Sequence, residues 1–504
     1  MKKLPAVMLL LCALAFSFFA RAEETPGLRA LLIGCDHFLS QADTSPAAEN
    51  NVELLARALL TDSRGYTLVR TLPNTISSEA QMAQALRETF GDAEEGDISL
   101  LYISTHGVYT EGDPCGSAAL LLSDGIREEL LTARALKAML DAVPGKKLLI
   151  LDACHSGAFI GKGMSASSGA PLFCEQDYRV LCSAGGSEAS WYWQGSDAVS
   201  GGASYFATVL GEALGVHGSY PADRNADGDV TLAEVYDYIR ENYAASTPQV
   251  YPQREERFTV LRYDPARLTT PGDTVTDITF DDTLLPAGQR EVSFTFTVHR
   301  PCRLYYQLVY HENGVWQFST AQHILDAEQP DGQTLPGRKA RTLCLDTGQE
   351  DNFGYAMLQF VAVEDGTPSL QGARLLCVPP ASGDVSLSVT TGGAFCPEAG
   401  GEAAIQVLHD KPCGLTVSVR NAKGETVRYL SYETPSRPQQ LTPAGSTFYW
   451  DGRDSGERLC PPGRYTVLVQ VRIGETVYTA ESEPFQLLPG QYHTVRRIPL
   501  TPRA

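Results

Sequence analysis

The sequence predicts an α/β domain with a mainly parallel sheet flanked by helices, followed by two all-β sandwich domains. Two observations support this prediction. Up to about residue 265, short apolar runs alternate with amphipathic segments, which is typical of a parallel sheet covered on both faces. Past Pro265 the apolar residues recur at every second position, as they do in the half-buried strands of sandwiches.

The elements of the first domain follow in chain order. Short apolar runs of strand length predict strands at 28–34, 66–72, 98–103, 147–151 and 179–184. Longer segments of helical periodicity predict helices at 47–60, 78–90, 205–214 and 232–243. We therefore expect this domain to cover residues 25–265.

The second half carries the period-two pattern. Val292, Phe294, Phe296 and Val298 alternate with polar residues, and the same alternation occupies 302–310. A further strand is expected at 355–363. A proline-rich linker near Pro379 then separates a β domain over 270–380 from a second one over 384–490.

Two reactive side chains follow the ends of apolar strands. His106 comes after the run 98–103, and Cys154 comes after the run 147–151. In an open parallel sheet the crevice lies beyond the carboxyl ends of the strands, so both side chains are expected at one edge. A thiol attacks a carbonyl as the thiolate, and a nearby imidazole can lower its pKa and later protonate the leaving amine. The pair indicates a Cys/His hydrolase site; the alternative is a strand-end histidine and a buried cysteine.

The residues around this pair resemble a known family. They read Thr-His-Gly at 105–107 and Asp-Ala-Cys-His-Ser-Gly at 152–157. The two reactive residues lie 48 positions apart, close to the spacing of about 50 in caspases. Residues 25–265 therefore resemble the caspase and metacaspase superfamily of cysteine peptidases.

The resemblance implies a caspase-like fold and an endopeptidase that hydrolyses peptide bonds through a Cys154/His106 dyad and a thioester acyl-enzyme. It assigns the oxyanion hole to the backbone amides of Gly107 and Cys154, and a glycine lets backbone approach a substrate carbonyl closely. His155 is interpreted as a structural residue that points elsewhere. A peptide or protein substrate is expected, and no organic cofactor.

Residues beside the dyad bear on specificity. Asp152 shares a strand face with Cys154 by alternation, and the corresponding metacaspase aspartate lines the S1 pocket and selects Arg or Lys. The second acidic residue of that pocket is missing, because Asn51 occupies the matching position. A role for Asp152 in capping a turn stays open. Trp191 and Trp193 are interpreted as subsite walls, with a packed core cluster as the alternative.

A Gly/Ser/Ala-rich stretch follows the cysteine, over 157–173. Its composition predicts a mobile loop at the rim of the cleft. Lys162 is its only basic residue, and related enzymes are often cut in this region. Lys162 is therefore the candidate position for self-cleavage.

A pattern similar to an EF-hand loop occupies 223–234. Its candidate calcium ligands are Asp223, Asn225, Asp227, Asp229 and Glu234. Short oxygen side chains at alternate positions can converge on one cation, and the final glutamate can bind through both oxygens. The preceding residues do not favour an entering helix, so a complete EF-hand is not expected. We expect a structural or activating Ca²⁺; a capping box of Thr231 and Glu234 is the alternative, and both can hold at once.

The first 22 residues have the features of a cleavable export signal. Two lysines precede an apolar segment at 4–19, and Ala-Arg-Ala at 20–22 predicts cleavage near Ala22. No later run of 18 apolar residues appears, which predicts a secreted or otherwise extracytoplasmic protein without a membrane span. The mature chain carries 37 basic and 60 acidic residues, so nucleic acid is not an expected partner.

The last domain resembles the FlgD-like immunoglobulin fold. The resemblance rests on segment 415–427 with a turn at Gly424, on Trp-Asp-Gly at 450–452 and on Cys-Pro-Pro-Gly-Arg-Tyr at 460–465. Both β domains are thus expected to be immunoglobulin-like sandwiches, acting as spacers or binding modules for an unknown ligand. Six cysteines of this half are disulfide candidates: Cys302, Cys344, Cys377, Cys396, Cys413 and Cys460.

The favoured function is a secreted caspase-like or metacaspase-like cysteine endopeptidase, with a preference for Arg or Lys and with calcium dependence. Two alternatives stay open. One is a catalytically inactive caspase-like module for adhesion or protein binding. The other is a transpeptidase, which uses the same dyad and transfers the acyl group to an amine.

Overall fold

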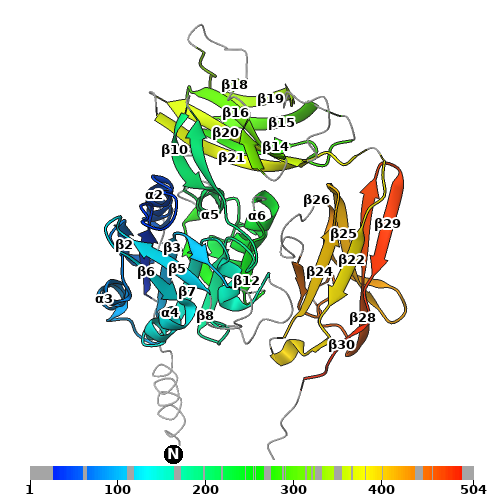
Figure 1. Cartoon of the computed structure of the whole chain (residues 1–504), viewed down its shortest axis with the longest axis horizontal. Helices are drawn as coiled ribbons and strands as arrows, with labels where there is room; N and C mark the ends of the chain where they lie inside the picture. Colours follow the sequence, from blue (N-terminus) through cyan, green and yellow to red (C-terminus); the bar gives the residue numbers. More distant parts are fainter. Residues whose placement is uncertain are drawn as a thin grey trace, which may run out of the picture.

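The structure is a computed structural model of the chain. It describes residues 27–490 apart from 61–64, 111–117, 164–171, 197–198, 217–219, 244–245, 254, 256, 266–273, 287–288, 290, 313–314, 319–321, 324–331, 346–354, 365–366, 381, 400, 437–446 and 457. The expected export signal at 1–22 lies outside the described residues. Figure 1 shows an N-terminal α/β domain, a middle β domain above it and a C-terminal β domain beside it.

The described strands of the α/β domain include a six-stranded sheet. Its order is β12 (Gln249–Tyr251), β8 (Tyr178–Cys182), β7 (Lys146–Asp152), β3 (Ile98–Ser104), β1 (Leu28–Gly34) and β2 (Tyr66–Pro73). Neighbouring strands from β8 to β2 are parallel, and β12 is antiparallel to β8. The sheet is therefore mainly parallel, with one antiparallel edge strand that the sequence analysis did not predict.

Helices cover both faces of this sheet. One face packs against α2 (Ala47–Leu60), α5 (Tyr205–Ala213) and α6 (Leu232–Asn242), and the other packs against α3 (Glu79–Phe90) and α4 (Ala133–Leu140). Successive side chains of a strand point to opposite faces, so Leu32 lies in the first core and Leu31 and Ile33 lie in the second. Strand β1 and helix α2 have the predicted bounds.

Smaller elements accompany the six-stranded sheet. An antiparallel meander follows β3, and a hairpin precedes α5. These elements are β4 (Gly107–Val108), β5 (Ala119–Ser123), β6 (Glu128–Thr132), the 3₁₀ turn η1 (Ser156–Ile160), β9 (Tyr192–Ser196), β10 (Val199–Ser204), β11 (Asp229–Thr231) and β13 (Thr259–Arg262). The sequence analysis named neither the meander nor helix α4.

The middle β domain has two sheets around one apolar core. The first consists of β14 (Val275–Phe280), β15 (Glu291–Val298) and β19 (Gly337–Cys344). The second consists of β17 (Val315–Phe318), β16 (Arg303–Glu312), β20 (Tyr355–Glu364), β21 (Thr367–Cys377) and β18 (Gln322–His323). The predicted alternation of Val292, Phe294 and Phe296 holds, because all three side chains are buried.

The C-terminal β domain is also built of two sheets around a core. One has β22 (Leu387–Thr391), β24 (Ala403–His409) and β27 (Thr447–Trp450). The other has β23 (Ala394–Phe395), β30 (Phe485–Leu487), β28 (Gly463–Ile473), β25 (Cys413–Asn421), β26 (Thr426–Ser436) and β29 (Thr476–Glu481), and a 3₁₀ turn, η3 (Pro397–Ala399), precedes β24. Gly424 has a φ of 79° in the turn between β25 and β26, as its predicted role requires.

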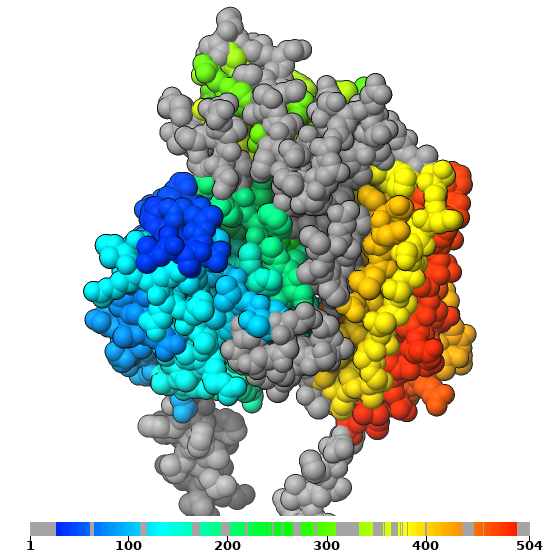
Figure 2. Space-filling model, in the orientation of Figure 1, coloured from blue at the N-terminus to red at the C-terminus, as the bar shows by residue number. Residues whose placement is uncertain are grey.

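Contacts between described residues join the three domains, which Figure 2 shows in the orientation of Figure 1. Val361 of β20 belongs to the same apolar cluster as helix α5, and the Tyr205 hydroxyl donates to Gln359 Oε1 at 2.8 Å in a buried position. Between the middle and the C-terminal β domains, the Cys377 sulfur lies 3.7 Å from the carbonyl oxygen of Cys413. Arg240 of α6 donates to the carbonyl of Leu430 at 3.4 Å. No described helix is long and apolar enough to cross a membrane.

The cysteines proposed as disulfide candidates are free thiols, as are the other described cysteines. The expectation of disulfides is therefore not met in this structure. Cys377 illustrates the reason, because its sulfur donates to the backbone carbonyls of Cys413 and Ser436 instead of bonding to another sulfur. Burial raises the pKa of this thiol to about 12.

Candidate active site

The register of the parallel strands aligns three strand ends. Gly34 pairs with Ser104 and Ser104 pairs with Asp152, so the three residues form one row across β1, β3 and β7. The residues two positions beyond this row are Asp36, His106 and Cys154. The predicted dyad therefore occupies equivalent positions on neighbouring strands, at the edge where parallel α/β sheets bind their ligands.

The ring of His106 is held on two sides. Its Nε2 lies 2.8 Å from the backbone carbonyl oxygen of Ala42. Because a carbonyl oxygen can only accept a hydrogen bond, this nitrogen carries the proton, and Nδ1 is the acceptor of the neutral ring. The ring of Phe38 packs against the imidazole with 4.5 Å between centroids. His106 is thus fixed in the tautomer whose Nδ1 can take up a proton.

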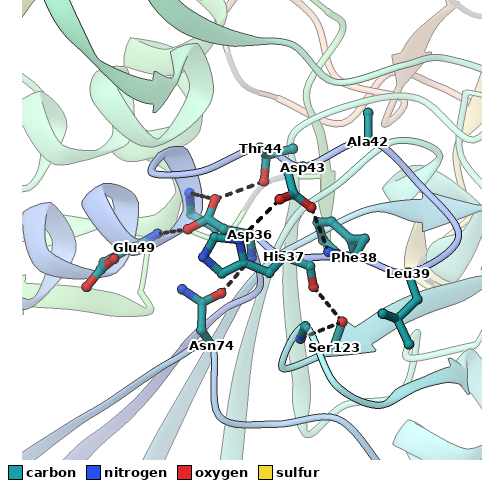
Figure 3. Close-up of polar contacts among 12 residues, drawn as sticks. Asp36, His37, Phe38, Leu39, Ala42, Asp43, Thr44, Glu49, Asn74 and Ser123 are labelled. Atoms are coloured by element: carbon teal, nitrogen blue, oxygen red, sulfur yellow. Dashed lines mark hydrogen bonds and ion pairs between the residues drawn. The ribbon is translucent and has the colours of Figure 1, made fainter.

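Asp36 supports the loop that supplies Ala42, between β1 and α2 (Figure 3). Its buried carboxylate accepts hydrogen bonds from the Thr44 hydroxyl and from the N–H groups of Ala48 and Glu49, each at 2.8 Å. The two amides belong to the first turn of α2, whose N–H groups have no partner within the helix. Asp36 therefore caps α2 and fixes the loop to it.

The same loop is held by a hydrogen bond within it and by another to the β4–β6 meander. Asp43 accepts the N–H of Phe38 at 2.9 Å, and this contact, followed by that with His37, lowers the pKa of Asp43. Glu128 of β6 accepts the N–H of Leu39 at 2.8 Å. The sequence analysis missed this support. The signal that could have found Asp36 is its place directly after the first strand, matching the places of His106 and Cys154.

Cys154 is half-buried, and its sulfur lies 3.7 Å from the carbonyl oxygen of Ser190. Its pKa is raised above that of an ordinary cysteine. Burial is the main cause, and the charge of Asp152 acts in the same direction. The sequence analysis expected the imidazole to lower this pKa, whereas in the structure burial raises it. The thiol is therefore neutral at pH 7.

Gly107 is in contact with the backbone of the cysteine. A Cβ atom at this position would lie 1.8 Å from the carbonyl oxygen of Cys154, so no side chain can be accommodated. The N–H of Leu121 donates to the carbonyl of His106, which makes Gly107 and Leu120 a non-hydrogen-bonded pair. The N–H of Gly107 consequently faces away from β5. The sequence predicted a need for glycine here, but not its contact with Cys154.

Asp152 lies in a buried cluster of hydroxyl groups. It accepts hydrogen bonds from Tyr102 at 3.0 Å and from Ser190 at 3.3 Å. Burial raises the pKa of Asp152, and hydrogen bonds from hydroxyls, with Ser204 first among them, oppose this shift. The carboxyl group has no described basic partner.

Asn51 adjoins this cluster from helix α2. Its amide donates to the Ser104 hydroxyl at 3.0 Å, and its oxygen accepts the N–H of Ser204 at 2.9 Å. Trp191 is half-buried and packs against the apolar core below, as the packed-cluster alternative predicts. The side chain of Trp193 lies outside the described residues; its backbone in β9 pairs with Ala203.

The segment after Cys154 differs from the prediction. His155 has a φ of 59°, and its ring lies 3.0 Å from the carbonyl of Gly186, in line with its predicted structural role. Residues Ser156–Ile160 form η1, and the side chain of Lys162 is buried in an ion pair with Glu402. The prediction of a mobile loop is thus wrong for 157–163, because backbone bonds and this ion pair hold these residues. Residues 164–171 of the predicted loop lie outside the described residues.

The candidate calcium ligands at 223–234 accept hydrogen bonds from the same loop and from strand β13 and the residue after it. Asp223 accepts the N–H of Gly228 and the hydroxyl of Tyr263, at 2.9 and 2.8 Å. Asp229 pairs with Arg262, and Glu234 forms the capping box of α6 with Thr231 that the alternative interpretation predicted. The other two candidate ligands, Asn225 and Asp227, accept backbone N–H groups of the same loop. Among the described residues, no group of three or more His, Cys, Asp or Glu side chains is arranged to hold a metal ion. The calcium site stays a prediction.

Comparison with known protein families gives a match for the α/β domain. Residues 28–258 match the family of the caspase domain. This region is therefore similar to the caspase domain, a family that includes cysteine peptidases. The match covers somewhat less than half of the chain and leaves both β domains outside it.

Solved structures and curated proteins were compared as well. Caspase-1 from Spodoptera frugiperda is 17% identical, with a TM-score of 0.32, over 48% of this chain and 93% of that chain. Latent PorU from Porphyromonas gingivalis is 10% identical, with a TM-score of 0.17, over 43% of this chain and 20% of that chain. A tetra-tandem repeat in the extending region of a large adhesion protein is 11% identical, with a TM-score of 0.15, over 43% and 50%. No curated protein matches the sequence.

The raised pKa of Cys154 leads to a prediction about its reactivity. In the free protein, the rate of alkylation of Cys154 by iodoacetamide should be low at pH 7 and should still be rising at pH 9, because only the thiolate reacts. Peptide mapping by mass spectrometry gives the rate at this cysteine alone. A plateau reached below pH 7 would show a stable thiolate–imidazolium pair and would contradict the structure.

The buried carboxyl of Asp152 leads to a prediction about stability. Its folded-state pKa is raised, so the folded protein loses stability as pH rises above the unfolded pKa of about 3.9. Asp152→Asn removes this loss, and its free energy of unfolding relative to the wild type should increase between pH 4 and pH 7 in urea titrations.

Asp454→Asn is the matched control. The pKa of Asp454 is lowered, first by the N–H of Arg458, so this variant should lose stability relative to the wild type as pH rises through the unfolded pKa of about 3.9, with little further change above about pH 5. Equal pH dependence in the two variants would show that burial does not control the titration of Asp152.

The capping box and the calcium site make different demands on Glu234. Glutamine can also reach back to the Thr231 N–H, so Glu234→Gln should keep its melting temperature in the presence of a chelator within about 2 °C of the wild type. Bidentate binding of Ca²⁺ requires the carboxylate. If the loop binds calcium, millimolar Ca²⁺ should raise the melting temperature of the wild type and not that of the variant. An equal response of both proteins would exclude Glu234 as a ligand.

Proposed function

We propose that the chain is an extracytoplasmic cysteine endopeptidase, in which Cys154 is the nucleophile and His106 is the general base and acid. The observation that carries this proposal is the fixed tautomer of His106. Its Nε2 is occupied by the Ala42 carbonyl, and its Nδ1 is the basic nitrogen at the strand end next to that of Cys154. A nucleophile beside an oriented base is the arrangement that acyl transfer requires.

The proposed reaction begins with a neutral thiol. His106 Nδ1 takes the proton of Cys154 as the sulfur attacks the scissile carbonyl, and a carbon–sulfur bond forms while the carbonyl π electrons move to oxygen. The tetrahedral intermediate collapses, the carbon–nitrogen bond breaks, and the imidazolium gives its proton to the leaving amine. Water, deprotonated by His106, then attacks the thioester and releases the acid and the thiol.

The oxyanion would be stabilised by the amides of Gly107 and Cys154. Gly107 supports this role because its N–H faces away from the neighbouring strand β5. Within the described chain, the N–H of Cys154 makes no hydrogen bond to another residue and lies close to its own sulfur. Both donors belong to backbone that is packed in place, so they need no rearrangement during the reaction.

The specificity proposed for this site is a basic residue at P1. Asp152 is a buried carboxyl group surrounded by hydroxyls, and a guanidinium or ammonium group entering this cluster would favour its ionised form. Asn51 stands where a second carboxylate would strengthen the attraction, and its amide is already bonded to Ser104 and Ser204. The preference is therefore expected to depend on Asp152 alone.

Further parts of the proposal concern the setting of the enzyme. Export through a signal at 1–22 would bring the peptidase to extracytoplasmic peptides or proteins, and bound calcium at 223–234 would stabilise it. The β domains would then be immunoglobulin-like modules that bind a ligand. The two lysines before the apolar segment at 4–19 support export. The spacing of oxygen side chains at 223–234 supports calcium binding, and the segments 415–427, 450–452 and 460–465 support the immunoglobulin-like fold.

A panel of fluorogenic peptides tests the proposed function. Among peptides with Arg, Lys, Asp or Asn at P1, the wild type should cleave only those with Arg or Lys. Cys154→Ala should lower the turnover rate by at least about 10³-fold. In Asp152→Asn, kcat/KM for the basic peptides should fall by about 10-fold or more, because the cation loses its partner.

The outcomes separate the alternatives. No turnover that depends on Cys154, with or without calcium, would favour a binding module. Cleavage only after Asp or Asn would remove the assigned role of Asp152. Addition of an amine acceptor that diverts product from acid to amide would show transpeptidation.

A further inference from the structure

Lys162 lies eight residues after Cys154, and its ammonium group is buried between two domains. Only 8% of its side chain and 16% of that of Glu402 are exposed. The Nζ atom lies 2.8 Å from Glu402 Oε2, and also 2.8 Å from the carbonyl of Val250 and from Gln253 Oε1. The ring of Tyr449 lies beneath it, 4.5 Å from nitrogen to centroid. Glu402 and Tyr449 belong to the C-terminal β domain, 240 or more residues away in the chain.

The backbone beside Lys162 is bonded to that domain as well. The N–H of Gly163 donates to the Tyr449 hydroxyl at 2.8 Å. Gly163 has a φ of 67°, and a Cβ atom here would lie 2.5 Å from Gly185 Cα, so the chain is tightly packed at this point. Both a side chain and a backbone amide of the segment after the cysteine therefore end on the C-terminal domain.

The segment 184–190 connects these contacts to the nucleophile. Gly186 and Ser187 donate to the carbonyls of Lys162 and Gly163, each at 2.9 Å. In the other direction, the carbonyl of Glu188 accepts the N–H of His155 at 2.8 Å, and the carbonyl of Ser190 contacts the Cys154 sulfur. Residues 154–163 and 184–190 thus form one hydrogen-bonded unit, with Cys154 at one end and Lys162 at the other.

The charge of Lys162 makes this unit depend on Glu402. A buried ammonium group is costly unless an anion and further acceptors surround it. The other two hydrogen-bond acceptors, from Val250 and Gln253, are neutral. Without the carboxylate, moving the ammonium group of Lys162 toward water would lower its free energy. This movement would pull the backbone at 162–163 away from Gly186 and Ser187.

We propose that Glu402 of the C-terminal β domain is a positioning residue for Cys154, acting through the buried ion pair with Lys162. The C-terminal β domain is then needed to hold Cys154 in position, in addition to any ligand that this domain binds. This inference rests on the proposed peptidase function for its effect on turnover. Its effect on the reactivity of Cys154 is independent of that function.

The test uses the full-length protein and three variants. Glu402→Gln keeps the size of the side chain and removes its charge. Lys162→Met combined with Glu402→Met removes both charges, a change that is often tolerated at buried pairs. Glu433→Gln is the control, because Glu433 forms an exposed ion pair with Arg472 in the same domain, at 3.1 Å. The kinetic constants, the alkylation rate of Cys154 and the melting temperature are measured for each.

Glu402→Gln should lower kcat by about 10-fold or more with less than about 3-fold change in KM, because the nucleophile is displaced while the P1 pocket remains. The alkylation rate of Cys154 should change by about 3-fold or more. The double variant should recover kcat to within about 3-fold of the wild type. Glu433→Gln should match the wild type in every measurement.

A folded Glu402→Gln with the kcat and the alkylation rate of the wild type would overturn the proposal, as would a raised kcat. If this variant does not fold, Tyr449→Phe decides, because it keeps the ion pair and removes the hydrogen bond to Gly163. It should lower kcat by about 2- to 5-fold at nearly the same melting temperature, and an unchanged kcat would refute the coupling. If the wild type shows no peptidase activity, the proposed function fails, and the alkylation rates still test the positioning role.

Discussion

Hydrogen bonds between the parallel strands β1, β3 and β7 hold Gly34, Ser104 and Asp152 in one row, and the candidate site depends on this register. Parallel strands end at the same edge of a sheet, so the residues that follow the row are brought together. They differ in what they do: Asp36 caps a helix, whereas His106 and Cys154 carry reactive groups. A slip of one residue in any strand would turn its side chains to the opposite face and separate the pair.

Backbone packing around the cysteine is the second constraint. Gly107 lies against the carbonyl of Cys154, and a Cβ atom at Gly157 would lie 2.6 Å from the carbonyl oxygen of Lys162. Each glycine stands where two segments approach too closely for a side chain. The donors proposed for the oxyanion hole are therefore fixed by packing. The same packing buries the thiol and raises its pKa, so the proposed reaction starts from the neutral thiol.

The β domains are packed against the α/β domain. The middle domain adds Val361 to the core around helix α5 and binds Tyr205 through Gln359. The C-terminal domain contributes the carboxylate that neutralises Lys162. Both contacts involve residues that are close in the chain to the candidate site. Tyr205 directly follows Ser204, which belongs to the hydroxyl cluster around Asp152, and Lys162 lies eight residues after Cys154. The unit that holds the site is thus larger than the region that matches the caspase family.

The sequence by itself determined the main strands and helices of the first domain and the places of His106 and Cys154 just after two strand ends. Strong apolar periodicity gave β1 and α2 their bounds, and His106 and Cys154 were predicted because a strand end is a local signal that a single sequence carries. The sequence analysis missed the β4–β6 meander, α4 and the contact of the Ala42 carbonyl with His106. Short elements produce little apolar periodicity in a sequence, and the position of a backbone atom produces none. Only the tertiary structure decided that Lys162 is buried and not mobile, because its partners Glu402 and Tyr449 lie 240 or more residues away. It also decided the pKa of Cys154, since burial and charge depend on which segments meet in space and not on their order in the chain.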